Sequence, residues 1–208
     1  DGRVVMLGTL MAFVALAVSL DLLVGTTGML SLGHAAFFGA GAYLSTILVQ
    51  ELGWPLPLAG LAAIGLVAAA ALVVGVAAAR TVGLYFAIVS FAFGELLVQL
   101  VNNTTSVSGG SEGLPVEFGL GAQMPFGWSI YRYFCLWIVV AAMVTLVVTA
   151  LVRNTHLGLR LTAVRESENL TRGLGFNPTT YKTAIFVMAS SLAALIGVVY
   201  APMAGFIN

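Results

Sequence analysis

A short segment between two apolar runs combines residue types that could form a polar path at membrane depth. Gly25–His34 contains three glycines and three hydroxyl residues, and no charged residue. Such residues sustain a continuous helix poorly, and non-helical backbone within a bilayer needs protein or a water-filled cavity to satisfy it. A helix that begins near Ser31–His34 would direct its partly positive N-terminal amides into such a cavity. Broken helices of this kind mark substrate paths in transporters, although an ordinary cytoplasmic turn explains the same composition equally well.

One carboxylate lies well inside a later apolar run. An unpaired Glu95 would be costly there, so we expect it to face the bundle interior or water and to have a partner. It is either a pathway residue or a structural carboxylate near the outer interface. His34 alone is more typical of a hydrogen-bonded interior histidine than of a ligand, and Asp21 fits an interfacial role. Our candidate pathway residues are Gly28, Ser31, Gly33, His34, Tyr85 and Glu95.

The elements that hold these residues are long apolar runs. Of 208 residues, 60% are hydrophobic, and there are only eight acidic and eight basic residues. This composition excludes a soluble globule and a disordered chain. Because a helix needs about 20 residues to cross roughly 30 Å of hydrocarbon, we predict six spans, near 4–23, 34–50, 57–79, 83–101, 133–152 and 181–201. The expected fold is therefore an all-α polytopic membrane helical bundle.

Several other chemistries are excluded by the sequence. The formal net charge is zero, which gives no reason to expect a nucleic acid partner. The single Cys135 rules out an intrachain disulfide and a four-cysteine zinc site. The only lysine is Lys182, and no G-x-x-x-x-G-K-[ST], HExxH or GxSxG motif is present. We therefore expect no catalytic centre, no metal and no cofactor.

Two polar segments interrupt the apolar pattern and predict the orientation. Segment 102–130 holds six glycines and no basic residue, whereas segment 153–182 holds five of the eight basic residues. The positive-inside rule makes the second segment cytoplasmic. Counting spans outward then places 102–130 and Asp1 outside and Arg80 inside. An external start suggests a preceding span, and the abrupt apolar end suggests further spans, so we interpret 1–208 as one membrane domain that is a core fragment.

The basic segment has the pattern of a short amphipathic helix. One side of it repeats at helical spacing and consists of Leu161, Val164, Ser167, Leu170 and Leu174. Glu168 can pair with Arg165 and with Arg172 on the polar side. Gly173 and Gly175 predict its end, and Asn177-Pro178 predicts an N-cap and first-turn proline for the last span. A solvated charged face is the other interpretation of this pattern.

Longer stretches carry a family resemblance. Leu20–Tyr43, which reads LDLLVGTTGMLSLGHAAFFGAGAY, resembles the signature of the branched-chain amino acid ABC transporter permeases, the LivH/LivM family. Further stretches resemble the LivM side of that family: Arg80–Glu95, Ser108–Leu114, Gly158–Glu166 and Leu174–Lys182. The matching stretches follow one another in the family's order from about residue 18 to about residue 206.

The resemblance implies an ABC importer permease fold and one part of a four-part pump in the bacterial inner membrane. Its partners would be a second permease subunit (LivH-like or another copy of this chain), two cytoplasmic ATPase subunits and a periplasmic substrate-binding protein. Its substrate would be a branched-chain or similar hydrophobic amino acid, and membrane lipid would surround it. Urea or amide permeases share much of the pattern. An ion-coupled secondary transporter or channel is the alternative from another class.

The resemblance also implies roles for the two polar segments. The cytoplasmic segment 153–182 would couple ATP hydrolysis to transport, and our candidate coupling residues are Arg160, Val164, Arg165, Glu166, Glu168 and Gly175. Its apolar side would then enter a cleft on an ATPase. The acidic external segment 102–130, with Glu112 and Glu117, would be the place where the substrate-binding protein docks.

Overall fold

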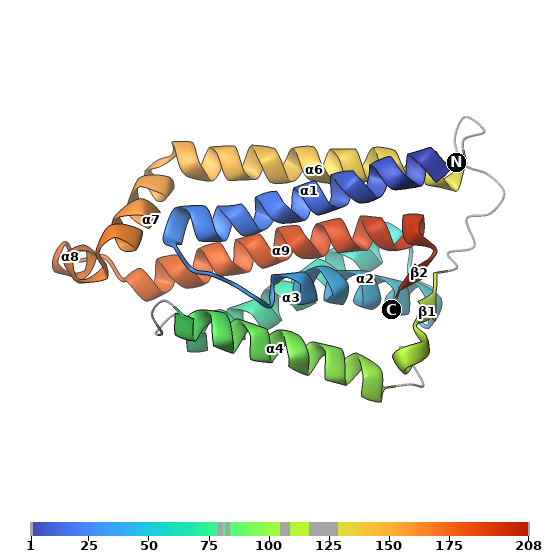
Figure 1. Cartoon of the computed structure of the whole chain (residues 1–208), viewed down its shortest axis with the longest axis horizontal. Coiled ribbons are helices and arrows are strands. Elements are labelled where there is room, and N and C mark those ends of the chain that lie inside the picture. Colours follow the sequence, from blue (N-terminus) through green and yellow to red (C-terminus); the bar gives the residue numbers. More distant parts are fainter. Residues whose placement is uncertain (1, 79–80, 82–83, 105–108, 117–128, 208) are drawn as a thin grey trace.

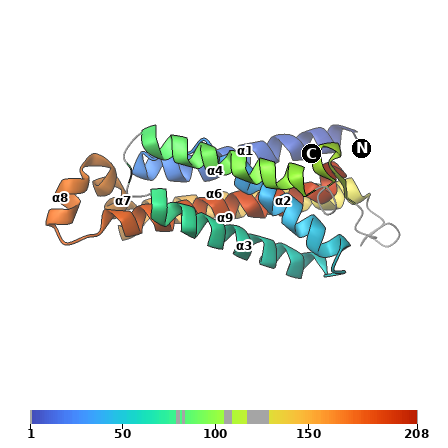
Figure 2. The same cartoon turned by 90° about the horizontal axis from the view of Figure 1, so that it is seen from below.

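The chain forms an elongated bundle of long helices (Figures 1 and 2). The computed structural model describes residues 2–78, 81, 84–104, 109–116 and 129–207. Long helices occupy all six predicted positions, so the predicted fold class is confirmed. They are α1 (Gly2–Thr27), α2 (His34–Gln50), α3 (Leu56–Ala78), α4 (Leu84–Asn103), α6 (Ile130–Asn154) and α9 (Pro178–Ala204). The predicted sites Arg80, Ser108 and Glu117 lie outside the described residues.

Five of these helices, α1, α3, α4, α6 and α9, are long and apolar enough to cross a membrane. The remaining predicted span, α2, has 17 residues. At 1.5 Å per residue it covers about 25 Å, which is less than the roughly 30 Å of hydrocarbon in a bilayer. By length, five of the six predicted spans are long enough to cross the membrane, and α2 is at the lower limit of about 17 residues.

Local sequence signals explain several helix ends. The α1 helix ends where Gly28 adopts a left-handed conformation, with φ of 70°, and its N–H donates to the Val24 carbonyl at 2.9 Å. The α9 helix begins as predicted, since Asn177 Oδ1 accepts a hydrogen bond from Thr179 N at 3.1 Å and Pro178 follows the cap. The C-terminal end of α9 is again a left-handed glycine, Gly205.

Helix α9 is the centre of the bundle. It packs against α1, α2, α3 and α6 (Figure 1) and is the most buried of the five candidate spans. Its backbone approaches α2 closely, because a Cβ atom at Gly41 would overlap the Ala194 backbone and one at Gly197 would overlap the Phe38 carbonyl oxygen. The small residues of α9 thus serve packing within the chain, which substitutes for the missing hydrophobic drive in lipid.

The two ends of the bundle carry different elements (Figure 1). One end holds α7 (His156–Glu166) and α8 (Glu168–Gly173), and the other holds η1 (Gly110–Glu112), β1 (Leu114–Pro115) and β2 (Phe206–Ile207). Strands β1 and β2 are antiparallel, with Leu114 opposite Ile207. The Gln50 amide donates to the Pro115 carbonyl at 2.8 Å, which ties α2 to this strand pair.

An aromatic cluster connects α2, α4 and α9. The ring of Phe37 stacks on Phe93 at 5.6 Å and meets Phe186 edge-on at 5.5 Å, while Phe86 meets Phe186 edge-on at 5.4 Å. Phe37, Phe86 and Phe186 are fully buried. Offset and edge-on pairs of this kind add to the stabilisation from burial. The cluster therefore fixes how the start of α2 sits against α4 and α9.

Candidate functional site

The non-helical segment 28–33 lies within the bundle rather than at its end. Directly after it, His34 Nε2 is 2.8 Å from Ser19 Oγ. Ser19 precedes the last residue of α1 by eight positions, so this contact is about 12 Å inside the end of that helix. The Leu32 N–H donates to Ser90 Oγ at 3.1 Å, several residues into α4. The backbone therefore re-enters the bundle before α2 begins.

Close contact with α4 explains one glycine of this segment. A Cβ atom at Gly33 would overlap the carbonyl oxygen of Ser90. A Cβ atom at Gly94, one turn further along α4, would come within 3.2 Å of Gly33 Cα. The two glycines thus let the segment and α4 meet backbone to backbone. Glycine is therefore needed at position 33 because it has no side chain, and not because of its backbone conformation, since its φ is not positive.

Two buried polar groups at the start of α2 have no protein partner. Ser31 and His34 are 4% and 3% exposed, and neither Ser31 Oγ nor His34 Nδ1 is hydrogen-bonded to a described residue. The other ring nitrogen of His34 is satisfied by Ser19, which fits the interpretation of an interior histidine. Buried polar groups are usually satisfied, so these two mark the segment as a place where water or a ligand can bind.

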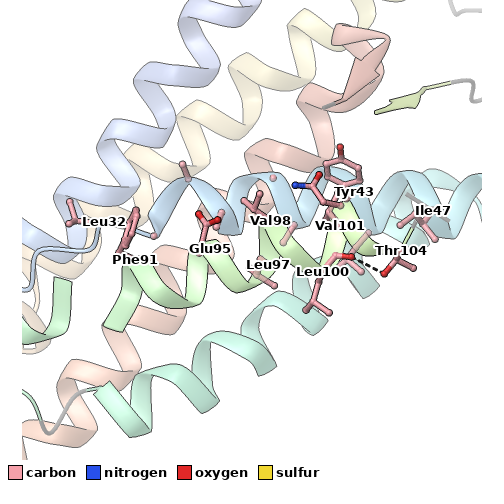
Figure 3. A pocket seen from close by; sticks show the side chains of 18 residues that line it. Leu32, Tyr43, Ile47, Phe91, Glu95, Leu97, Val98, Leu100, Val101 and Thr104 are labelled. Atoms are coloured by element: carbon pink, nitrogen blue, oxygen red, sulfur yellow. Dashed lines mark hydrogen bonds between the residues drawn. The ribbon is translucent and has the colours of Figure 1, made fainter. Parts of the chain in front are cut away.

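A cleft of about 640 Å³ opens beside this segment, between α2 and α4. Its walls are mostly small and aliphatic side chains, together with Tyr43, Phe91, Asn102 and Thr104. Figure 3 shows Leu32 and Phe91 at one end of the cleft and Ile47 and Thr104 at the other, with Glu95 between them. The cleft therefore runs from the non-helical segment along the length of α2.

Glu95 is the charged residue of this cleft. It lies 11 residues after the start of α4, which places it about 16 Å along a helix of 20 residues. The Gln99 amide donates to its Oε1 at 3.3 Å, so the expected partner is a neutral side chain on the same helix. Tyr85 is 71% exposed near the start of α4 and does not line the cleft. The structure brings Gly33 and Glu95 together but leaves Tyr85 apart from them.

A second, polar cavity of about 610 Å³ lies where segment 28–33 begins. Thr27, Gly28 and Met29 line it together with α7, α8 and Lys182. Arg165 Nη1 donates to the Gly25 carbonyl at 2.8 Å and closes one side of it. The segment thus separates two cavities, since its first residues face the polar one and its last residues face the apolar cleft.

The predicted amphipathic helix consists of two helices. Ser167 adopts an extended conformation after α7 and caps α8, where its Oγ accepts a hydrogen bond from Leu170 N. Gly173 ends α8 as predicted, and Gly175 has a left-handed φ of 85°. Val164 is 1% exposed and Leu161 is fully buried, because α7 packs against α1 and α6. This part of the predicted apolar face therefore belongs to the chain's own core.

The apolar side chains that remain exposed in this region are different ones. Leu159, Leu170 and Leu174 are each about two-thirds exposed. Arg160 lies over the Phe176 ring at 5.1 Å and donates to the Tyr181 hydroxyl at 3.1 Å, so it links α7 to the start of α9. The exposed apolar side chains at this end of the bundle are therefore these leucines rather than Val164.

The ion pairs at this end also differ from the prediction. The predicted Arg165–Glu168 pair is absent among the described ion pairs, because Arg165 is turned towards α1. Glu168 pairs with Arg172 at 3.8 Å, as predicted, and with Lys182, whose side chain is only 5% exposed. Glu166 lines the polar cavity.

The sequence analysis did not identify several residues that support the non-helical segment. Ser19, Ser90 and Gly94 support the non-helical segment, and each is a small or polar residue within an apolar helix. Small and polar residues within apolar helices can be recognised in the sequence, but the sequence does not tell which helices face one another. Asp21 pairs with Arg153 at 2.6 Å in an exposed position, and the sequence analysis named no partner for it. Among the described residues, no three His, Cys, Asp or Glu side chains cluster as metal ligands do.

Comparisons with known proteins match almost the whole chain. A family described as "Branched-chain amino acid transport system / permease component" matches residues 3–208. The chain is similar to the "High-affinity branched-chain amino acid transport system permease protein LivM" of Salmonella typhimurium and to that of Escherichia coli. Each is 31% identical over 224 aligned positions, which cover 95% of this chain and 52% of the relative. The chain thus spans about half the length of these relatives. No solved structure matches.

Proposed function

Because the chain belongs to the family of permease components of branched-chain amino acid transport systems, we propose that it is the membrane-spanning part of an ABC importer. In this proposal it translocates branched-chain or similar hydrophobic amino acids. A periplasmic binding protein delivers the substrate, and separate ATPase subunits supply the energy. A second permease subunit, LivH-like or identical to this one, completes the pathway.

The observation that carries this proposal is the re-entrant segment 28–33 with the cleft beside it. Non-helical backbone at this depth is tolerated where it lines a cavity, and transporters place substrates at such interrupted helices. The apolar cleft lies beyond one end of the segment and the polar cavity beyond the other. In our proposal the pathway joins these two cavities past Gly28, Ser31, Gly33 and His34.

The orientation forms part of the same proposal. The α7–α8 end carries Arg153, Arg160, Arg165, Arg172 and Lys182, so the positive-inside rule favours a cytoplasmic position for it. The exposed leucines and the ion pairs of α7 and α8 would then meet an ATPase, with Arg160, Arg165, Glu166, Glu168 and Gly175 in supporting positions. The opposite end, with Glu112, would meet the substrate-binding protein.

Reconstituted uptake tests this function. The full-length permease with its ATPase and second permease subunits is placed in proteoliposomes, with ATP inside and the liganded binding protein outside. We expect uptake of labelled leucine that requires both ATP and the binding protein and that persists when ion gradients are collapsed. Competition by unlabelled leucine but not by urea or glutamate is expected. Uptake driven by an ion gradient without ATP would contradict the proposal, and competition by urea would point to an amide permease.

A further inference from the structure

The two short strands at one end of the bundle bring together elements from three long helices (Figure 1). Strand β1 follows η1, which contacts α4, and β2 comes directly after α9. Pro115 of β1 lies opposite Phe206 of β2, and the Val116 N–H donates to the Gly205 carbonyl at 3.0 Å. The Gln50 amide at the end of α2 donates to the Pro115 carbonyl at 2.8 Å. Helices α2, α4 and α9 are therefore all tied to this strand pair.

The turn that contains η1 is compact and should transmit movement. Gly109 and Gly113 both have a positive φ, of 72° and 78°, which glycine adopts without strain. The Gly113 N–H donates to the Gly110 carbonyl at 3.2 Å, and a Cβ atom at Gly109 would overlap the Gly113 carbonyl oxygen. Because this turn is closed on itself, we expect η1 and β1 to move as one unit with the end of α4.

The three helices tied to the strands differ in how firmly they pack. Helices α2 and α9 interlock at Gly41 and Gly197, and we call them the α2–α9 frame. Helix α4 is the least buried of the five candidate spans and forms one wall of the cleft, with α2 as the other. Ile47 lines the cleft about one turn before Gln50 (Figure 3). The strand pair is thus an extra tie between the loosely packed α4 and the frame, beside this end of the cleft.

We infer that the β1–β2 pair is a latch that holds α4 to the α2–α9 frame and keeps this end of the cleft narrow, with Gln50 as its positioning residue. The bond from Gln50 crosses from the frame to the strand that follows α4. The Tyr43 hydroxyl donates to the Ile207 carbonyl at 3.3 Å, but Ile207 follows α9, so this second bond lies within the frame. The role of the latch in transport rests on the proposed function, which puts this end of the cleft on the side where the binding protein delivers substrate.

Cysteine labelling at this end of the cleft tests the latch without requiring transport. Ile47→Cys in the full-length permease complex, with no other cysteine, is reacted with a water-soluble maleimide. The labelling rate follows the population of the open form. Leu52→Cys is the control position, because Leu52 is exposed just beyond α2 and does not line the cleft. Its labelling should be the same in every variant.

Three variants separate the latch bond from general loosening. Gln50→Met removes the amide at similar side-chain length, so we expect Ile47→Cys to label roughly two- to tenfold faster, the range for losing one hydrogen bond. Gln50→Lys keeps an N–H donor and should label like the wild type. Tyr43→Phe removes the bond within the frame and should also label like the wild type.

A disulfide across the strands tests whether the latch must part during transport. Positions 115 and 206 form a non-hydrogen-bonded pair, since Val116 bonds to Gly205 beside them and proline has no N–H. Cα atoms in such pairs lie about 4.5 Å apart, within the range for a disulfide, and both side chains are exposed. We expect the oxidised Pro115→Cys/Phe206→Cys variant to lose most of its ATP-dependent leucine uptake and to regain it on reduction. Each single-cysteine variant, oxidised in the same way, should keep its uptake.

Several results would overturn the inference. Unchanged Ile47→Cys labelling in Gln50→Met would mean that Gln50 does not hold the cleft narrow, and equal acceleration in Gln50→Lys or Tyr43→Phe would show a general loosening of this end. Full uptake by the permease with a verified disulfide would mean that the strands need not part. Labelling requires no substrate, so the latch can fail its test while wild-type uptake is normal. Absence of ATP-dependent leucine uptake by the wild type, with the expected labelling pattern, would refute the proposed function and leave the latch in place.

Discussion

The ion pair between Lys182 and Glu168 should hold α8 to the base of α9, and its two halves should differ in importance. The Lys182 side chain is 5% exposed, while that of Glu168 is 22% exposed and also has Arg172 at 3.8 Å. Removing one partner of a fully buried pair costs about 3–5 kcal/mol because the other charge remains unpaired. Glu168→Gln leaves the ammonium buried, so we expect about 3 kcal/mol. Lys182→Met leaves Glu168 near water and Arg172, so we expect about 1–2 kcal/mol.

Limited proteolysis of the full-length complex measures this local opening. Under native conditions trypsin cleavage after Arg172 follows the population of the open form. Since 1.4 kcal/mol corresponds to a factor of ten, the cleavage rate should rise roughly hundredfold in Glu168→Gln and roughly tenfold in Lys182→Met. The double variant should resemble Lys182→Met, because no buried charge is then left alone. Asp21→Asn, which breaks an exposed pair, should leave the rate unchanged. Equal effects of the two single variants would refute the reasoning.

Three further predictions follow from exposure and close contact. Leu170→Glu, on the exposed side of α8, should lower the stimulation of ATP hydrolysis by the liganded binding protein without changing the yield of permease. Val164→Glu should instead lower the yield of folded permease, because Val164 is buried. The opposite pattern would mean that Val164, and not Leu170, contacts the ATPase. Gly33→Ala should reduce the amount of assembled complex, because forcing a Cβ atom into packed backbone should cost about 1–3 kcal/mol of stability. Gly39→Ala should leave the thermal unfolding temperature unchanged. Glu112→Gln should slow association of the binding protein at low salt more than at high salt, which stopped-flow kinetics can measure.

The apolar runs and the helix caps were predictable because they are local properties. The thickness of the bilayer sets the length of an apolar run, so each predicted span lies within a few residues of a helix. The cap at Asn177 and the glycine stop at Gly173 depend on backbone chemistry within one turn. The interrupted start of α2 could be suspected for the same reason, since glycines and hydroxyls disfavour helix over 28–33.

The sequence could not predict which side chains or helices contact each helix face, because these contacts depend on tertiary packing. Helical spacing placed Val164 on an apolar face, but it did not say that α1 and α6 already cover that face. Likewise, one pattern of charges allowed Glu168 to pair with Arg165 or Arg172, and the structure uses Arg172 and Lys182. The facing glycines Gly33 and Gly94 come from segments far apart in the sequence, so no local pattern indicates their contact.

The interlocked backbones of α2 and α9 have a mechanical consequence. At Gly41 and Gly197 each helix fits against the other's main chain, so neither can slide without separating first, and close-packed interiors resist gradual deformation. Helix α4 differs, because its main helix contacts are with α2 and α3 and much of its surface is exposed. If a rigid-body motion widens or narrows the cleft, we therefore expect α4 to move about its glycine contact with Gly33, while α2 and α9 stay together.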